Sequence, residues 1–434
     1  MIELLLLLLF FAVLIGCVIL GSSILYALVF GYFLFFGCGL IKGKTGKEML
    51  YFSFLGILTV KNILIIFTLI GVITAVWRAC GTIAFIVYYA SLFCVPQAMV
   101  LITFLLCCLV SLLMGTAFGS AATIGVICMT LANSMNIPVI YTGGAILSGI
   151  FFGDRCSPMS SAAHLISELT KTNIFNNIKT MMKTAFVPFI ITTVLYFIIG
   201  FAVNAGTGNG MTFHIFLEYY NLSFLTVIPA AIIIVFSLFK INVKITMGAS
   251  CLAGILCALF LQRIHLAEVI KILFLGFKPV NAELAKLMAG GGIISMVRVS
   301  AIICISSCYS GMFKGMHFLD EIQKVIQRLS CRITVFGSIL VASVFASAIG
   351  CNQSLAIMLT HQVCGSVIDD NELFASHLEN TAVVIAPLIP WSIAVTTPLT
   401  SINAPITSLL PAFYLYLIPL WNLATLTLKG KKSL

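Results

Sequence analysis

The stretch that decides the fold is Ile150-Phe-Phe-Gly-Asp-Arg-Cys-Ser-Pro-Met-Ser-Ser161. It places a carboxylate and a guanidinium, Asp154 and Arg155, among apolar residues. Gly153 and Pro158 flank this pair, and both residue types interrupt helices, since glycine is conformationally permissive and proline lacks an N–H donor. An ionisable residue at membrane depth is costly and marks a functional site by default. A polar loop between two membrane spans is the alternative interpretation of the same stretch.

A second part of the chain, in its C-terminal half, repeats features of this region. Gly119-Ser-Ala-Ala-Thr-Ile-Gly-Val126 aligns with Gly350-Cys-Asn-Gln-Ser-Leu-Ala-Ile357, an offset of 350 − 119 = 231. Ser157-Pro-Met159 aligns with Ala386-Pro-Leu388, an offset of 387 − 158 = 229, and each copy carries a carboxylate upstream of its proline. Paired segments interrupted by Gly and Pro point to the binding site of a secondary transporter.

The composition excludes an ordinary soluble protein. Of the 434 residues, 61% are hydrophobic and only 8% are charged, whereas soluble domains carry about 25% charged residues. The mean hydropathy is +1.18. Ile2 to Ile41 alone is long enough for two crossings at about 1.5 Å per residue. The sequence therefore predicts a multi-pass protein embedded in the lipid bilayer.

The net charge of +10 does not indicate nucleic-acid binding, because much of the excess lies in short loops between apolar segments. By the positive-inside rule these loops face the cytoplasm. Both termini are therefore predicted to be cytoplasmic, with the protein in the cell membrane. The fifteen cysteines include no C-x-x-C pair and are interpreted as buried small hydrophobic residues. No cofactor is predicted.

The predicted fold is all-α, with about 11–13 transmembrane or re-entrant helices in two repeats of inverted topology whose broken helices meet at the membrane midplane. Gly153 and Pro158 are predicted to break helices in the first repeat, and Pro387 and Pro390 in the second. The predicted divisions are N-terminal membrane helices with a basic loop at 1–60, the first repeat at 61–204, connecting helices and loops at 205–287 and the second repeat at 288–434.

Several short motifs spread over roughly residues 70–400 carry a family resemblance. They are Trp77…Gly81-Thr82, Gly115-Thr…Gly119-Ser, Phe152-Gly-Asp-Arg-Cys-Ser-Pro-Met-Ser160, Cys351-Asn-Gln-Ser-Leu-Ala-Ile357 and Leu378-Glu-Asn…Ala386-Pro-Leu-Ile-Pro-Trp391. In these motifs the chain resembles the NhaC family of sodium/proton antiporters. The resemblance implies a secondary antiporter, not an enzyme, that exchanges sodium for protons by alternating access. Its likeness to transporters of this general type also allows a homodimer.

Three acidic positions of the family are replaced in this chain. Where the family often has Asp, Asp and Glu, this chain has Ser161, Asn352 and Lys314. The wider family also includes exchangers that move an organic acid or an amino acid against sodium. The candidates to pair with an anionic substrate, or to neutralise Asp154 and Glu379, are Arg78, Arg155, Arg298 and Lys314. Sodium- or proton-coupled exchange of a small organic acid or amino acid therefore stays open as an alternative.

Sodium needs oxygen ligands, which carboxylate, hydroxyl, amide and carbonyl groups supply. The predicted ion- or substrate-binding residues are Asp154, Ser157, Ser160, Ser161, Asn352, Gln353, Ser354, Glu379, Asn380 and Thr381. Asp154 and Glu379 are the predicted sodium-binding exchange carboxylates, because a carboxylate that holds either a proton or sodium gives obligatory exchange. Burial raises the proton affinity of a carboxylate and a nearby base lowers it, so Arg155 is predicted to tune Asp154.

Two other classes of protein share parts of this pattern. An intramembrane aspartyl protease needs two carboxylates that share a proton. Gly153-Asp154 is not accompanied by a Tyr-Asp dipeptide, which argues against this class. A channel would give unitary currents, which distinguish it from slow coupled exchange. Coupled transport is the interpretation that the paired interruptions favour.

Overall fold

The computed structural model is built from helices, as predicted for an all-α polytopic membrane protein. It describes residues 2–430 apart from 21, 92–94, 159, 204–210, 240, 317, 319–327, 329–332 and 366. Within these residues β-type pairing is limited to an isolated antiparallel bridge between Phe277 and Gly290.

The helices of the first half are α1 (Ile2–Ile19), α2 (Ile24–Ile41), α3 (Gly46–Thr59), α4 (Lys61–Ala79), α5 (Thr82–Ser91), η1 (Pro96–Ala98), α6 (Met99–Met114), α7 (Ala117–Ser120), η2 (Ala121–Gly125), α8 (Val126–Ser134), α9 (Val139–Cys156), α10 (Ser161–Thr170) and α11 (Ile174–Ala202). Those of the connecting region are α12 (Met211–Tyr219), η3 (Phe224–Val227), α13 (Ile228–Leu238), α14 (Val243–Phe260), α15 (Leu266–Leu275) and α16 (Ala282–Met288). Those that follow are η4 (Ile293–Met296), α17 (Val297–Gly315), α19 (Val335–Gly350), α20 (Gln353–Cys364), α21 (Asn371–Asn380), α22 (Ala382–Ile385), η5 (Ala386–Leu388), α23 (Ile393–Ser401), η6 (Ile406–Leu409) and α24 (Phe413–Gly430).

Five of the described helices are long and apolar enough to cross a membrane, or up to seven if each bent pair is one span. One bent pair joins Leu64–Ala79 to Thr82–Tyr89 at 62°, and the other joins Asn371–Leu388 to Ile393–Ser401 at 56°. Shorter apolar helices of 10–17 residues accompany them. Non-helical backbone at membrane depth survives only where protein or a watery cavity surrounds it, so the bends are the places to look for a site.

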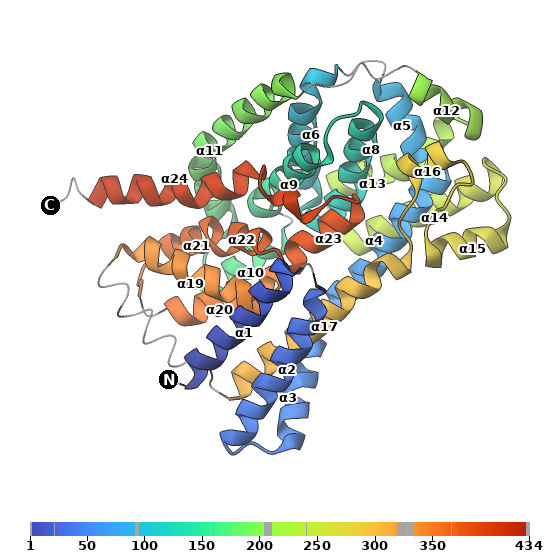
Figure 1. The fold of residues 1–434 in the computed structure, drawn as a ribbon. Helices are drawn as coiled ribbons and strands as arrows, with labels where there is room; N and C mark the ends of the chain where they lie inside the picture. The colour runs from blue at the N-terminus through green and yellow to red at the C-terminus, as the bar shows by residue number, and fades with distance from the viewer. Residues whose placement is uncertain are drawn as a thin grey trace.

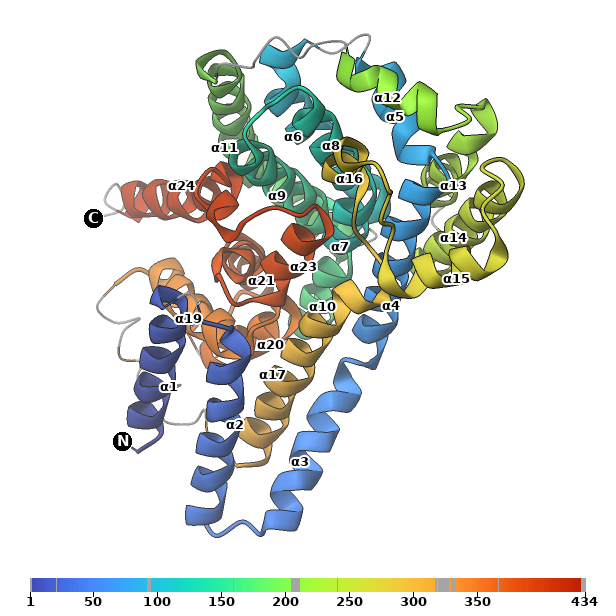
Figure 2. The same ribbon diagram turned by 45° about the vertical axis from the view of Figure 1, so that its right-hand side comes forward.

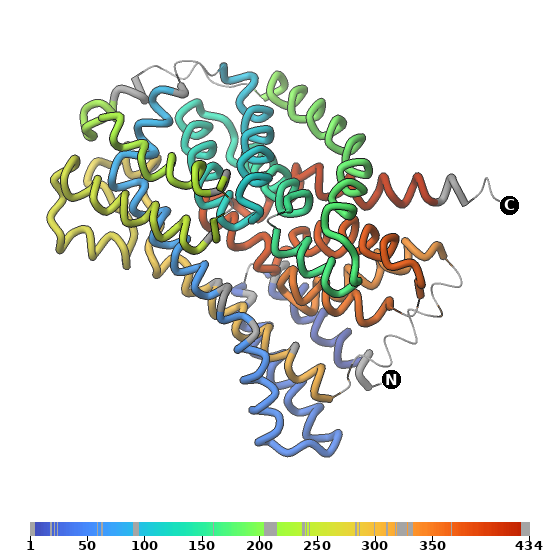
Figure 3. The backbone as a smooth tube through the Cα atoms, turned by 180° about the vertical axis from the view of Figure 1, so that it is seen from behind, coloured from blue at the N-terminus to red at the C-terminus, as the bar shows by residue number. Residues whose placement is uncertain are grey.

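The helices form a central body with two extensions (Figure 1). In Figure 2, α1, α2, α3 and α17 extend together away from the centre, and α12 to α16 lie on another side. Within these groups α17 packs along α2 and α3, and in the central body α6 packs along α9. Seen from behind in Figure 3, α11 and α24 cover one side of the centre.

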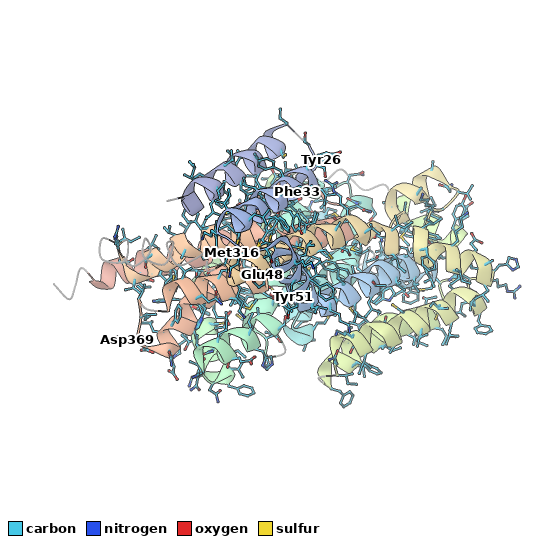
Figure 4. The ribbon with its side chains drawn as sticks, turned by 90° about the horizontal axis from the view of Figure 1, so that it is seen from below. Tyr26, Phe33, Glu48, Tyr51, Met316 and Asp369 are labelled. Carbon is cyan, nitrogen blue, oxygen red and sulfur yellow. The ribbon has the colours of Figure 1, made fainter. Side chains whose placement is uncertain are left out.

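The outer faces of α2 and α3 are apolar. Figure 4 labels Tyr26 and Phe33 on α2 and Tyr51 on α3, and these side chains are 71%, 66% and 60% exposed. Lipid tails are as apolar as a protein core, so such faces are stable against the bilayer. The exposure therefore fits helices that contact lipid.

Short polar residues start the helices next to the paired interruptions. The side chains of Ser160, Asn352, Asp370 and Ser392 each accept a hydrogen bond from a backbone N–H two or three residues later. Such caps satisfy N–H groups that the first turn of a helix leaves free, and each stabilises the helix by about 1 kcal/mol. Ser160 and Asn352, which are predicted ion ligands, therefore also hold helix starts in place.

The helix bounds are consistent with the predicted repeat. Helices α4 (Lys61–Ala79) and α17 (Val297–Gly315) both have 19 residues, and 297 − 61 = 236. Helices α6 (Met99–Met114) and α19 (Val335–Gly350) both have 16 residues, and 335 − 99 = 236. Two neighbouring helix pairs of equal length at one offset support an internal repeat. The inverted relation between the two halves stays a prediction, as do the four divisions of the chain.

The repeat continues at a slightly smaller offset. Helix α9 (Val139–Cys156) corresponds to the helical segment Asn371–Leu388, because 371 − 139 = 232. A serine cap starts the next helix in both halves, Ser160 and Ser392, and 392 − 160 = 232. The sequence alignment predicts offsets of 231 and 229, whereas the helix bounds give 236 and 232. Small residues recur often in membrane helices, whereas helix ends mark the register directly.

Gly153 does not break a helix, so this prediction is wrong. Helix α9 continues past it to Cys156 and ends just before Pro158, which does interrupt the chain as predicted. A glycine inside a helix costs only about 1 kcal/mol, which tight packing offsets. Gly153 instead brings α9 against α6, because a Cβ at this position would overlap the backbone of Ser111 and Leu112.

Replacing Gly153 by alanine is expected to destabilise the protein, because the added methyl group has no room against the α6 backbone. Overpacking of this kind costs about 1–3 kcal/mol, which thermal unfolding in detergent would detect as a lower Tm. The matched control is Gly37→Ala in α2, where a Cβ meets no atom within 4 Å. Equal Tm values for the two variants would contradict this account of α6–α9 packing.

Candidate functional site

A cavity of about 300 Å³ lies where the two interrupted segments meet. Thr116–Phe118 from the first half and Asn352–Leu355 from the second half both line it. Each segment follows a helix that ends at a left-handed residue, Gly115 (φ 62°) or Cys351 (φ 52°), and then continues through one extended residue. These two breaks therefore face a common cavity, an arrangement typical of a transporter binding site.

Asp154 reaches this cavity from the last turn of α9 and is 4% exposed. The Gln353 side-chain amide donates a hydrogen bond to Asp154 Oδ2, with Nε2 and Oδ2 3.0 Å apart. The Ala117 backbone N–H and the Ser160 hydroxyl also approach the carboxylate. All three donors are neutral, so an ionised Asp154 is not compensated by a neighbouring base. A buried carboxylate in this situation attracts a cation.

Other polar groups line the same cavity. Those among the predicted site residues are Ser161, Asn352, Gln353 and Ser354. Thr116 and Ser307 also line it and were not predicted; Ser307 Oγ is buried and has no hydrogen-bond partner among the described residues. Thr116 could have been found from the repeat, because it precedes Asn352 by the same offset that relates α6 to α19 (352 − 116 = 236). No sequence signal marks Ser307.

The described lining of the cavity contains no lysine or arginine. Arg78 is buried within α4, where its Nη1 donates to the Thr74 carbonyl at 3.1 Å. Lys314 is exposed in the last turn of α17. Neither residue lies where it would pair with an anion in the cavity. One carboxylate among neutral oxygen atoms suits a cation better than an anion.

Arg155 points away from the cavity although it follows Asp154 in the sequence, because successive residues of a helix diverge by about 100°. Its guanidinium is fully buried and joins α9 to α11, α21 and α24. Its hydrogen-bond acceptors are the Glu379 carbonyl (3.2 Å), the Met181 carbonyl (3.3 Å), the Tyr414 hydroxyl (3.3 Å), the Thr184 hydroxyl (2.8 Å) and the Asn380 side-chain oxygen. The Arg155 guanidinium therefore connects these helices, and its predicted tuning of Asp154 stays a prediction.

Glu379 lies beside the second helix break, at the end of α21. It is fully buried, it does not line the cavity, and neither carboxylate oxygen has a hydrogen-bond partner among the described residues. Thr381 ends α21 with φ −124° and ψ −82°, and its hydroxyl donates to the His377 carbonyl at 2.7 Å. The two predicted exchange carboxylates therefore have different surroundings.

The remaining predicted residues lie around these two carboxylates. Ser157 is buried at the end of α9, outside the cavity lining. Asn380 accepts from Arg155, and its Nδ2 donates to the Asn422 side chain at 3.3 Å. The helix break predicted from Pro387 and Pro390 is present, since α22 passes into the short turn η5 and the chain bends before α23.

The fold and the cavity together define a class of protein. A helical membrane protein in which two broken segments surround a buried carboxylate has the architecture of a secondary transporter. The model of the Na+/H+ antiporter family matches residues 149–424, more than half of the chain, and the chain belongs to this family.

Individual relatives agree with the family and differ in their cargo. The chain is 26% identical to the Na+/H+ antiporter NhaC of Bacillus subtilis, over 82% of each chain. It is 25% identical to the malate-2H+/Na+-lactate antiporter of the same organism, over 86% of this chain and 82% of the relative. It is 23% identical to the arginine/ornithine antiporter ArcD of Halobacterium salinarum, over 80% of this chain and 74% of the relative. These relatives are transporters.

Proposed function

We propose that the protein exchanges sodium for protons across the cell membrane by alternating access, with both termini in the cytoplasm. The observation that carries this proposal is the cavity at Asp154, which offers one carboxylate and neutral oxygen atoms and no base in its described lining. Hard cations prefer carboxylate, hydroxyl and carbonyl oxygen ligands. Family membership and the relative named NhaC support the same cargo.

Asp154 is the proposed cation ligand, assisted by oxygen atoms at the mouth and walls of the cavity. Ser161, Ser307 and Ser354 line the cavity with Asp154, and Ser161 is exposed, so the cavity communicates with the outside of the protein. The Gln353 amide occupies one carboxylate oxygen, Oδ2, in this state. A sodium ion that binds Asp154 therefore competes with a neutral donor and not with a fixed positive charge.

Exchange of a small organic acid or amino acid is the second candidate. The cavity volume of about 300 Å³ reaches the lower end of small-molecule sites, which span about 300–1,000 Å³. The names of two relatives, one for malate and lactate and one for arginine and ornithine, point in this direction. The lack of a base in the described lining speaks against a carboxylate cargo, so sodium is the first choice.

Purified protein in liposomes with an acid lumen is expected to make the lumen more alkaline when sodium chloride is added outside, because protons leave as sodium enters. A pH-sensitive dye inside the liposomes measures the change, and choline chloride is the control salt. No response to sodium, lithium or potassium would contradict sodium/proton exchange. Uptake of an amino acid or small carboxylate against a sodium gradient would then support the second candidate.

A further inference from the structure

We propose that Glu379 is a proton-carrying site separate from the cation site at Asp154, and that sodium binding at Asp154 releases the proton from Glu379. This inference rests on the proposed sodium/proton exchange and divides its two tasks between two carboxylates. The cation enters from the cavity, whereas the proton is held outside the cavity lining, beside the break between α21 and α22.

The surroundings of Glu379 favour a protonated side chain in this state. The residue is fully buried, it is absent from the cavity lining, and its two carboxylate oxygens have no hydrogen-bond partner in the described part of the chain. Arg155 donates to the main-chain carbonyl of Glu379 and not to its carboxylate. An ionised carboxylate that is buried without a partner is strongly destabilised. A neutral carboxylic acid avoids this cost and carries one proton.

Hydrogen bonds connect two charged residues of opposite sign to the region of Glu379. Arg155 Nε donates to the Glu379 carbonyl at 3.2 Å, and Gln353 joins Asp154 to Val383, four residues after Glu379. Arg155 favours the ionised carboxylate, and an ionised Asp154 favours the protonated acid, because like charges repel. The other ionisable side chains near this point are Cys156 on α9 and Tyr414 on α24. His377 lies on α21 itself and is buried. Of these groups, Asp154 is the one whose charge a bound cation would neutralise, and this change would favour the ionised form of Glu379.

Sodium bound to Asp154 cancels the negative charge that opposes ionisation of Glu379. The positive charge of Arg155 remains, so Glu379 then loses its proton to water and becomes a carboxylate. One positive charge enters the pair of sites and one leaves, and the total charge is unchanged. By linkage, a proton bound to Glu379 weakens sodium binding at Asp154 by the same factor. The electrostatic interaction of the two carboxylates thus supplies the coupling that exchange requires.

Gln353 connects the two sites mechanically. Its Nε2 donates both to Asp154 Oδ2 at 3.0 Å and to the Val383 carbonyl at 3.2 Å. Val383 lies in α22, four residues after Glu379 and across the helix break. A sodium ion that binds Asp154 Oδ2 would weaken the hydrogen bond from the Gln353 amide to this oxygen. The same amide would then be free to change its hydrogen bond to the Val383 carbonyl of α22. Occupation of the cavity therefore acts on the segment beside the proton site.

The internal repeat also separates the two carboxylates. At the offset that relates α9 to its counterpart, Asp154 corresponds to Ala386 (386 − 154 = 232) and Glu379 corresponds to Leu147 (379 − 147 = 232). Each half thus contributes one carboxylate at a position where the other half has an apolar residue. The two acids are not copies of one ligand, which fits two different tasks.

The test measures sodium binding and proton release on the same purified protein in detergent. Radioactive sodium reports binding, and a pH indicator in weakly buffered solution reports protons released on addition of sodium chloride, with choline chloride as the control. The wild-type protein is expected to release roughly one proton for each sodium bound. Glu379→Gln should still bind sodium but release almost no protons. The matched control is Glu372→Gln, an exposed residue in the first turn of the same helix, which should behave as wild type.

Two outcomes would overturn the inference. Proton release at the wild-type level from Glu379→Gln would show that the proton comes from elsewhere, in the first instance from Asp154. A monodisperse Glu379→Gln protein that binds no sodium would show that Glu379 belongs to the cation site. A wild-type protein that binds no sodium at all would instead overturn the proposed function, on which the inference depends.

Discussion

Replacing Asp154 by asparagine is expected to reduce sodium/proton exchange to the level of empty liposomes. The substitution keeps the size of the side chain and removes the single carboxylate of the described cavity lining. An amide neither ionises nor binds a proton at working pH, so the site loses its charge for sodium. It also loses the negative charge proposed to act on Glu379. The fold should survive, because the neutral donors around Asp154 can still bond to the amide oxygen.

The dye assay in liposomes, with equal amounts of inserted protein, measures this loss. The control variant is Asp369→Asn, since Asp369 is exposed and lies at the edge of the molecule in Figure 4. Size-exclusion chromatography in detergent checks that both variants are folded. Sodium-dependent exchange at the wild-type rate in Asp154→Asn would remove Asp154 from the mechanism and leave Glu379 as the remaining buried carboxylate near the cavity.

Replacing Arg155 by lysine is expected to lower the Tm markedly and to abolish transport, although the charge is conserved. The Arg155 guanidinium donates to acceptors on α11, α21 and α24. Lysine offers three donors on a flexible stem and cannot reproduce this planar fork. Each hydrogen bond to a charged group contributes about 1.5–3 kcal/mol. The loss of two or more of these bonds should therefore destabilise the protein by several kcal/mol.

Thermal unfolding in detergent measures this effect. Arg298→Lys is the matched control, because Arg298 is exposed near the start of α17 and bonds only weakly, to Ser23 Oγ at 3.4 Å. An Arg155→Lys protein with the wild-type Tm would contradict the view that Arg155 holds the α9, α11, α21 and α24 helices together. Its role would then have to be sought in transport alone.

Local properties of the chain were sufficient to predict the class of fold. Long apolar tracts with few charges predict membrane helices wherever they occur, and five of the described helices, or up to seven if each bent pair is one span, are long and apolar enough to cross a membrane. Ser-Pro at Ser157 and the prolines at Pro387 and Pro390 end helices because proline lacks an N–H donor. The sequence predicts a functional site at Asp154 because an ionisable residue among apolar membrane residues is energetically costly. These inferences depend on neighbours in sequence alone.

The partners of each side chain were decided by the tertiary structure. Arg155 and Asp154 are adjacent in sequence, yet the helix turns them toward different surroundings. The residue type of Gly153 predicts a helix break, but the residue lies inside α9. The sequence does not reveal that the α6 backbone packs against this position and leaves no room for a larger side chain. Ser307 enters the cavity from α17, which belongs to the other half of the chain from Asp154.

The chain by itself therefore determined that the protein is a helical membrane protein with two interrupted segments and a buried acid, since hydropathy and proline chemistry are local. Only the tertiary structure decided that the breaks at Thr116 and Asn352 share one cavity and that Asp154 lines this cavity, while Glu379 is buried outside its described lining. The physical reason is that burial and hydrogen bonding depend on which helices pack together, and packing joins residues far apart in the sequence.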